Sequence, residues 1–157
     1  MARVGIISDT HGLLRPEALA FLGGCQHIIH GGDIGTAELL AQLAAVAPVT
    51  AVRGNNDRGT WADALAETEL FEIDGTYFYA IHDLAQLDID PAAAGVHVVV
   101  SGHSHKPVIE RRDGVVYVNP GSAGPRRFRL PIAVAELEVN GREVNARIVE
   151  LEVGRAA

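Results

Sequence analysis

The sequence has few of the features that mark secreted, membrane-bound or nucleic-acid-binding proteins. Cys25 is the only cysteine, so no disulfide can form within the chain. No apolar run approaches the ~18 residues of a membrane-spanning helix. The first residues also lack the charged and apolar regions of a secretion signal. We therefore expect a cytoplasmic protein that makes no membrane contact.

Positive charge is also scarce. The chain has 13 lysine and arginine residues against 20 aspartate and glutamate residues, which gives a formal net charge of −7. The basic residues are dispersed, apart from Arg111-Arg112 and a small group at Arg126, Arg127 and Arg129. Because proteins that follow a nucleic-acid backbone usually carry a basic face, we expect no binding of a long duplex. A metal site could still bind phosphate.

The composition favours one α/β domain. With 157 residues the chain can bury its own core, and we expect a single domain over residues 1–157. Apolar residues make up 48% and aromatic residues 5%, with 17 glycines. This composition is typical of α/β proteins with aliphatic packing and tight turns.

Hydrophobic periodicity and turn residues indicate many short elements. Apolar runs predict strands at residues 3–8, 27–30, 49–52, 70–73, 76–81, 96–101, 108–112, 115–118, 132–139 and 144–153. Turns of the Asp-Gly or Asn-Gly type join three pairs of these strands into hairpins. Helices are predicted at 17–22 behind Pro16, after the N-cap Thr36, and briefly at 58–66, and residue 90 begins a short helix or turn.

Two histidines separated by one residue, His103 and His105, follow the strand at 96–101. Side chains at positions i and i+2 of an extended backbone point to the same side, so both imidazoles could reach one spot. An isolated pair of this kind is usually an exposed loop feature. The residues that follow the other strands decide between the two interpretations.

Good metal ligands follow four further strands: Asp9 and His11, Asp33, Asn55, and His82. Each could separately be an ordinary turn residue. In an α/β fold the strand ends face one crevice, so the whole set predicts a shared metal site. Three oxygen donors and four imidazoles exceed what one ion needs.

The ligand count therefore predicts two ions that share the Asp33 carboxylate as a bridge, ~3.5–4 Å apart. Mixed nitrogen and oxygen ligands favour divalent transition metals and disfavour Ca²⁺ or a thiolate zinc site. We expect Mn²⁺, with Ni²⁺, Fe²⁺, Co²⁺ and Zn²⁺ as alternatives.

The motifs, in their order along the chain, resemble those of the calcineurin-like metallophosphoesterase superfamily: Asp9-Thr10-His11, Gly32-Asp33, Gly54-Asn55-Asn56-Asp57, His82 and Gly102-His103-Ser104-His105. The small size and the turn Asn119-Pro120-Gly121-Ser122 are similar to YfcE-type phosphodiesterases. The resemblance implies the metallo-dependent phosphatase fold, an αββα sandwich of two mixed β-sheets flanked by helices.

The resemblance also implies a binuclear metal-dependent phosphodiesterase, a hydrolase in which the metal ions generate the attacking hydroxide. One ion would be held by Asp9, His11 and His105, and the other by Asn55, His82 and His103, with Asp33 bridging. Asp33, Asn55 and Asn56 are the catalytic candidates. The same site could instead hydrolyse phosphomonoesters or nucleotides. A third interpretation is a non-catalytic binding scaffold, as in the retromer subunit that shares this fold.

Asn56 departs from the pattern, because many relatives carry a histidine there and small YfcE-type members commonly a cysteine. An amide cannot supply a proton at neutral pH, so esters with good leaving groups should be preferred. Asp83 replaces a glycine that relatives tend to have after the ligand histidine. Residues that could support the ligands are Ser8, His30, Asp57, Asp83 and Ser104.

The partners that we expect are a small phosphoester substrate and further copies of the chain. Relatives of this size often form homodimers or homotetramers, and the apolar hairpins near the carboxyl end could provide the contact. Arg126 and Arg127 could reach a substrate phosphate, but paired arginines are more often solvated surface residues.

Overall fold

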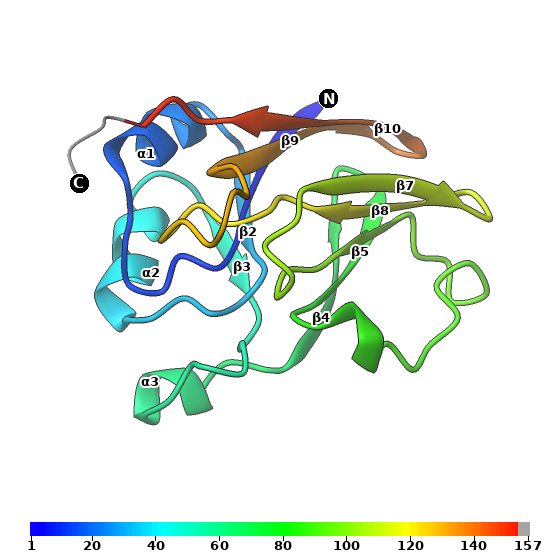
Figure 1. The fold of residues 1–157 in the computed structure, drawn as a ribbon. Helices are drawn as coiled ribbons and strands as arrows, with labels where there is room; N and C mark the ends of the chain where they lie inside the picture. Colours follow the sequence, from blue (N-terminus) through cyan, green and yellow to red (C-terminus); the bar gives the residue numbers. More distant parts are fainter. Residues whose placement is uncertain (154–157) are drawn as a thin grey trace.

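The computed structural model describes residues 1–153, and its strands form two mixed five-stranded sheets. The sheets pack face to face (Figure 1). The first sheet contains, in spatial order, β10 (Glu143–Glu150), β9 (Ala133–Asn140), β1 (Ala2–Ile7), β2 (His27–His30) and β3 (Val49–Ala51). The second contains β4 (Thr68–Ile73), β5 (Thr76–Ile81), β6 (Val98–Val100), β8 (Val115–Asn119) and β7 (Val108–Arg112).

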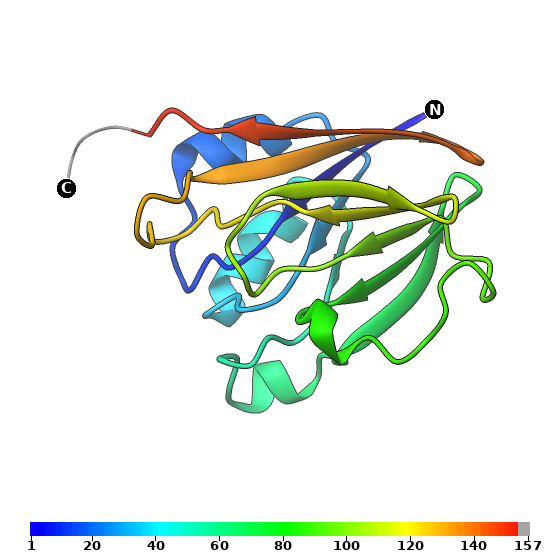
Figure 2. The same cartoon turned by 45° about the vertical axis from the view of Figure 1, so that its right-hand side comes forward.

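Helices α1 (Pro16–Leu22) and α2 (Ala37–Ala44) cover the outer face of the first sheet (Figure 2). The outer face of the second sheet is covered by the short 3-10 helix η1 (Leu84–Gln86) and the segment that follows it. The short helix α3 (Thr60–Asp63) precedes β4. The fold is thus the predicted sandwich of two sheets with helices outside, with a thinner cover on the second sheet.

Alternation of side chains along β6 shows how the core is divided. Val98 and Val100 face the core between the two sheets, whereas Val99 faces the cluster beneath η1. Successive side chains of a strand point to opposite faces, so a strand buried on both sides needs a continuous apolar run. The three valines meet this need.

Parallel pairing brings the strand ends together. In the first sheet β1 pairs with β2 and β2 with β3, all in parallel, and in the second sheet β5 pairs in parallel with β6. Hydrogen bonds then join the loops after the strands: Asp9 N donates to Gly32 O, and Gly102 N donates to His82 O. The loops that carry the predicted ligands therefore lie side by side at one edge of the sandwich.

Most predicted elements are confirmed within one or two residues. Thr36 caps α2, its Oγ1 accepting from Leu39 N, and Pro16 occupies the first turn of α1. The predicted helix at 58–66 is shorter, since Gly59 at φ 107° precedes its first residue. The segment at residue 90 is a turn.

The final strand ends at Glu150, where its partner β9 begins with Ala133, and not at residue 153. The end of the predicted domain, residues 154–157, lies outside the described residues. In the part of the chain that the structure describes, no helix has the length and apolar character needed to cross a membrane.

Candidate metal centre

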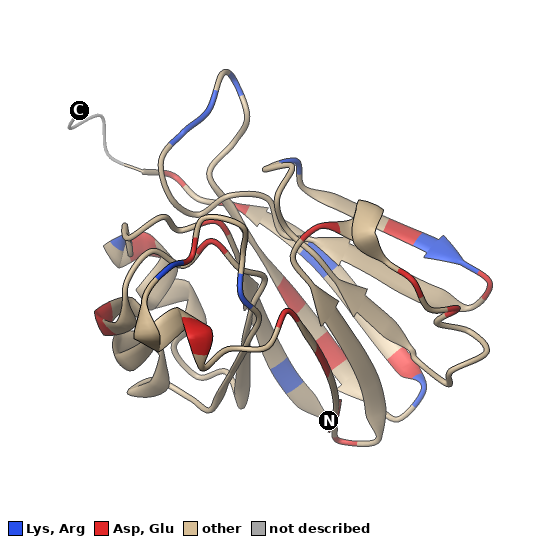
Figure 3. Ribbon diagram, turned by 90° about the horizontal axis from the view of Figure 1, so that it is seen from below, with Lys and Arg blue, Asp and Glu red and all other residues tan. Residues whose placement is uncertain are grey.

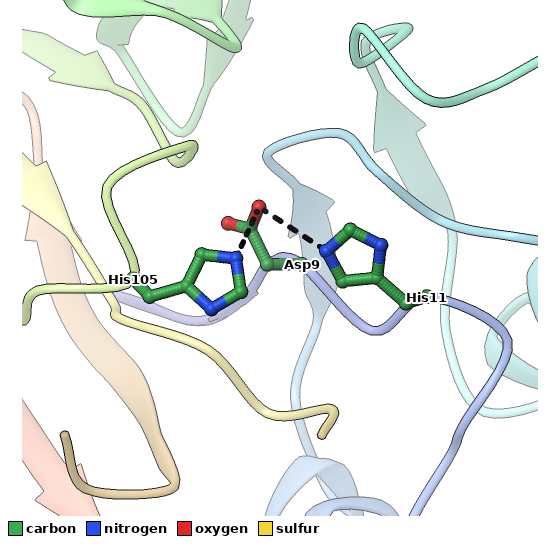
Figure 4. A group of neighbouring side chains, drawn as sticks. All are labelled: Asp9, His11 and His105. Carbon is green, nitrogen blue, oxygen red and sulfur yellow. Dashed lines mark ion pairs between the residues drawn. The ribbon is translucent and has the colours of Figure 1, made fainter. Parts of the chain in front are cut away.

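The first half of the site consists of Asp9, His11 and His105 (Figure 4). Nε2 of His105 lies 3.4 Å from Asp9 Oδ1, and Nε2 of His11 lies 4.0 Å from the same oxygen. Asp9 is fully buried and His105 is 3% exposed. A carboxylate and two imidazoles thus converge. Asp9 and His11 lie in the same loop, whereas His105 comes from a loop far away in the sequence.

The second half adjoins the first through Asp33. Its Oδ2 lies 3.3 Å from His82 Nε2 and 3.8 Å from His11 Nε2. Asp9 Oδ1 in turn lies 4.0 Å from His82 Nε2. The Asp33 carboxylate is therefore placed between the imidazoles of His11 and His82.

Asn55 and His103 complete the predicted set at the rim. Asn55 Oδ1 lies 3.2 Å from His103 Nδ1, and the His103 ring is 5.2 Å from the His82 ring, centroid to centroid. The His103 side chain is 46% exposed. All seven predicted ligand side chains thus gather in one place.

The backbone around His103 and His105 is not extended, which corrects the geometry expected from their spacing. The two residues have φ values of 72° and 63°, and Asp9, His11 and Asp33 are also left-handed. His105 reaches the Asp9 half, whereas His103 turns to Asn55 and His82. Left-handed conformations are costly for non-glycine residues and cluster at functional sites.

Polar atoms without hydrogen-bond partners are concentrated here. Among the described residues, the buried side-chain atoms of this kind are Asp9 Oδ1, His11 Nε2, His82 Nε2, His105 Nδ1 and Arg15 Nε. All but the last belong to the site. Buried polar groups are normally satisfied. Asp9 Oδ1 faces the unpaired Nε2 atoms of His11 and His82, each 4.0 Å away. A carboxylate oxygen and imidazole nitrogens in this arrangement fit a divalent transition metal.

Hydrogen bonds orient two of these ligands. His82 Nδ1 lies 2.7 Å from the Gly31 carbonyl oxygen. A neutral ring that donates there keeps the lone pair of Nε2 free. Asp9 Oδ2 accepts from Ser8 Oγ at 2.7 Å and from His103 N at 3.1 Å, which leaves Oδ1 available. Ser8 therefore has the supporting contact expected of it.

The turn after β3 fixes Asp33. Asn56 donates to this carboxylate twice, from its backbone N to Oδ1 at 2.9 Å and from Nδ2 to Oδ2 at 3.1 Å. Asp57 accepts from the backbone N of Ile34, Gly35 and Gly54. Asn56 thus fixes the carboxylate of Asp33, and Asp57 fixes the loop that carries Asp33.

His30 supports the loops from beneath the site. Its Nδ1 accepts from Gly32 N, so Nε2 donates to Thr10 Oγ1. Burial lowers the pKa of His30 to about 3, so the ring stays neutral. It lies outside the ligand groups, although it ends a strand.

The turn at residues 119–122 has a role that sequence reasoning missed. Asn119 Nδ2 donates to the Gly102 carbonyl and to Ser104 Oγ, and Ser122 Oγ donates to the Asp9 carbonyl. These bonds brace the loops of His103 and Asp9. The polar side chains of Asn119 and Ser122 could have indicated such a role from the sequence. Their partners could not be identified, because they are far away in the chain.

The ionisable groups of the site shift one another's pKa. Burial acts to raise the pKa of Asp33, but the nearby His82 imidazole and the hydrogen bond from the Asn56 backbone outweigh it and hold that pKa well below its usual value. Burial acts to lower the pKa of His82, yet the nearby Asp33 carboxylate and the Gly31 carbonyl raise it. Burial raises the pKa of Asp9. Asp33 is therefore anionic at neutral pH.

Asp83 and the two arginines at 126 and 127, which the sequence singled out, lie at the periphery of the site. Asp83 Oδ1 accepts from Ala85 N and caps η1, while Oδ2 lies 4.0 Å from His103 Nε2. Arg126 and Arg127 are exposed on the loop before β9 (Figure 3), and Arg126 donates to the Leu130 carbonyl.

Comparisons with known proteins match almost the whole chain. The model of the calcineurin-like phosphoesterase superfamily domain matches residues 2–142. A probable metallophosphoesterase of Methanothermobacter thermautotrophicus is 35% identical, over 93% of this chain and 91% of its own.

Solved structures with this fold include an archaeal phosphodiesterase, with a TM-score of 0.77 at 24% identity, over 94% of this chain and 99% of its own. Zinc-bound Vps29 of Entamoeba histolytica has a TM-score of 0.73 at 24% identity, over 94% and 98%. At this level of identity the likeness shows a shared fold.

Proposed function

The chain belongs to the calcineurin-like phosphoesterase superfamily, and on this premise we propose that it hydrolyses phosphodiesters with two divalent metal ions. The observation that carries the proposal is the group of unpaired polar atoms on Asp9, His11 and His82. A site built for anything other than a cation would leave these buried atoms without partners at a cost in stability.

Each ion has a proposed ligand set. Asp9, His11 and His105 hold one ion, Asn55, His82 and His103 hold the other, and Asp33 bridges them. The position of Asp33 Oδ2, within 4 Å of both His11 and His82, supports the bridge. Asp9 Oδ1 faces the histidines of both halves, so the two ions would sit close together.

Bound ions of this kind supply positive charge for the phosphate oxygens and an activated water. The chain's own residues hold and orient the ligands: Asn56 fixes Asp33, and the Gly31 carbonyl orients His82. Cys25 is buried in the core beneath the helices and cannot act as a nucleophile at this site.

Asn56 influences which esters react. Its Nδ2 donates to Asp33, and an amide cannot give a proton to a departing alkoxide at neutral pH. The position filled by histidine in many relatives therefore provides no general acid, so esters with good leaving groups should react faster.

The test compares bis(p-nitrophenyl) phosphate with p-nitrophenyl phosphate in Mn²⁺ and in chelator. We expect the diester to react faster by at least about tenfold in kcat/KM, a difference of ~1.4 kcal/mol in the barrier. Chelator should abolish the rate, and Mn²⁺ should restore it. A faster monoester would make the protein a phosphatase with the same site. Folded protein without activity in any divalent metal would favour the scaffold interpretation.

A further inference from the structure

A cleft of about 660 Å³ lies beside the candidate metal centre. Asn55, His82 and His103 form the wall that it shares with the site. His82 is 5% exposed, and its Nε2 faces Asp33 Oδ2 at 3.3 Å, so the cleft and the candidate metal centre meet at this side chain. The volume is typical of pockets for small ligands. An ester group attached to a phosphate at the metal centre could therefore occupy the cleft.

Negative charge predominates in the lining. Glu67, Asp83 and Asp88 contribute carboxylates, and among residues 1–153 the only lysine or arginine that lines the cleft is Arg53. Arg53 Nη2 lies 3.1 Å from Glu67 Oε1, so these two charges pair with each other, and Asp83 and Asp88 carry the excess negative charge. Acidic residues recur along the segment after β5 (Figure 3). An additional phosphate group in the cleft would meet like charge, whereas a cation would be attracted.

Tyr79 adds an aromatic surface to the same cleft. It belongs to β5, and together with Ile81 it forms an apolar part of the lining. Aromatic rings attract cations through their electron-rich faces, and quaternary ammonium groups are recognised in this way. The carboxylates of the lining therefore favour a cation, and Tyr79, which is 8% exposed, adds at most a small aromatic contact.

We propose that the cleft binds one ester group of a phosphodiester substrate and selects a group that carries an ammonium cation. The inference rests on the proposed function, because the phosphate would lie at the candidate metal centre. Neutral ester groups of the same shape bind less well, and phosphate-bearing groups are disfavoured.

The experiment uses two p-nitrophenyl diesters that differ in a single charge. One is p-nitrophenyl phosphocholine, and the other has a tert-butyl group in place of the trimethylammonium group. With Mn²⁺-loaded protein, kcat/KM should be about tenfold higher for the choline ester, as expected for an exposed ion pair plus a cation–π contact. Asp88→Asn should lower this ratio about threefold.

Glu143→Gln is the matched control, because Glu143 is an exposed carboxylate on β10 that does not line the cleft. It should leave the ratio unchanged. A wild-type ratio of one or less, or an unchanged ratio in Asp88→Asn, overturns the inference. Hydrolysis of bis(p-nitrophenyl) phosphate reports the proposed function separately. If none of the three esters reacts, the proposed function and the inference both fail.

Discussion

Asp33→Asn is expected to lower Mn²⁺-dependent diester hydrolysis by about a thousandfold, a loss of ~4 kcal/mol in transition-state stabilisation. The amide keeps the shape of the side chain but removes the negative charge between His11 and His82. One oxygen of the Asp33 carboxylate also becomes an NH₂ group, which cannot accept the hydrogen bond that Asn56 Nδ2 donates to Oδ2 if it takes that position. The measurement is kcat/KM for bis(p-nitrophenyl) phosphate, beside the midpoint of thermal unfolding.

Asp113→Asn provides the control for this substitution. Asp113 has φ 51°, close to the 56° of Asp33, but is exposed in the turn between β7 and β8. Asparagine tolerates this backbone conformation. The activity of Asp113→Asn should therefore equal that of the wild type. Retention of a tenth or more of the activity in Asp33→Asn would argue against a bridging carboxylate, as would an equal loss in both variants.

Gly54→Ala is expected to destabilise the protein by at least about 3 kcal/mol and to disrupt the site. A Cβ at this position would overlap the backbone N and the carboxylate of Asp33. Backbone atoms cannot move aside as a flexible side chain can. The strand end that carries Asn55 would have to shift away from Asp33. Urea unfolding measures the stability, and metal affinity reports the site.

Gly23→Ala separates steric overlap from the general effect of adding a methyl group. Gly23 has φ −59°, and a Cβ there would make only ordinary contact with the Ala20 carbonyl, at 3.4 Å. The free energy of unfolding of this variant should lie within about 0.5 kcal/mol of the wild-type value. Similar stabilities for the two variants would show that the β3 loop can move away from Asp33.

Local chemistry made much of the fold predictable from the sequence. Thr36 was recognisable as an N-cap, and it makes the expected bond to Leu39. The strand before His103 was recognisable from its valines, which are buried on both faces. Because ligand residues directly follow parallel strands, their convergence could also be predicted. What they bind remains a prediction that the structure supports through the unpaired atoms.

Contacts between distant segments were not predictable. The left-handed backbone at His103 and His105 is set by the surrounding loops, since residue type alone favours another conformation. The bonds from Asn119 to Gly102 and from Ser122 to Asp9 join residues far apart in the chain. The role of Asn56 likewise depends on the position of Asp33, which comes from a different strand end.

The most direct measurement is the anomalous scattering of Mn²⁺ in crystals grown with this metal. Two peaks are predicted, ~3.5–4 Å apart, with the Asp33 carboxylate between them. One peak should contact His11 and His105, and the other His82 and His103. A single peak at full occupancy, or peaks that make no contact with Asp33, would contradict a binuclear site at these strand ends.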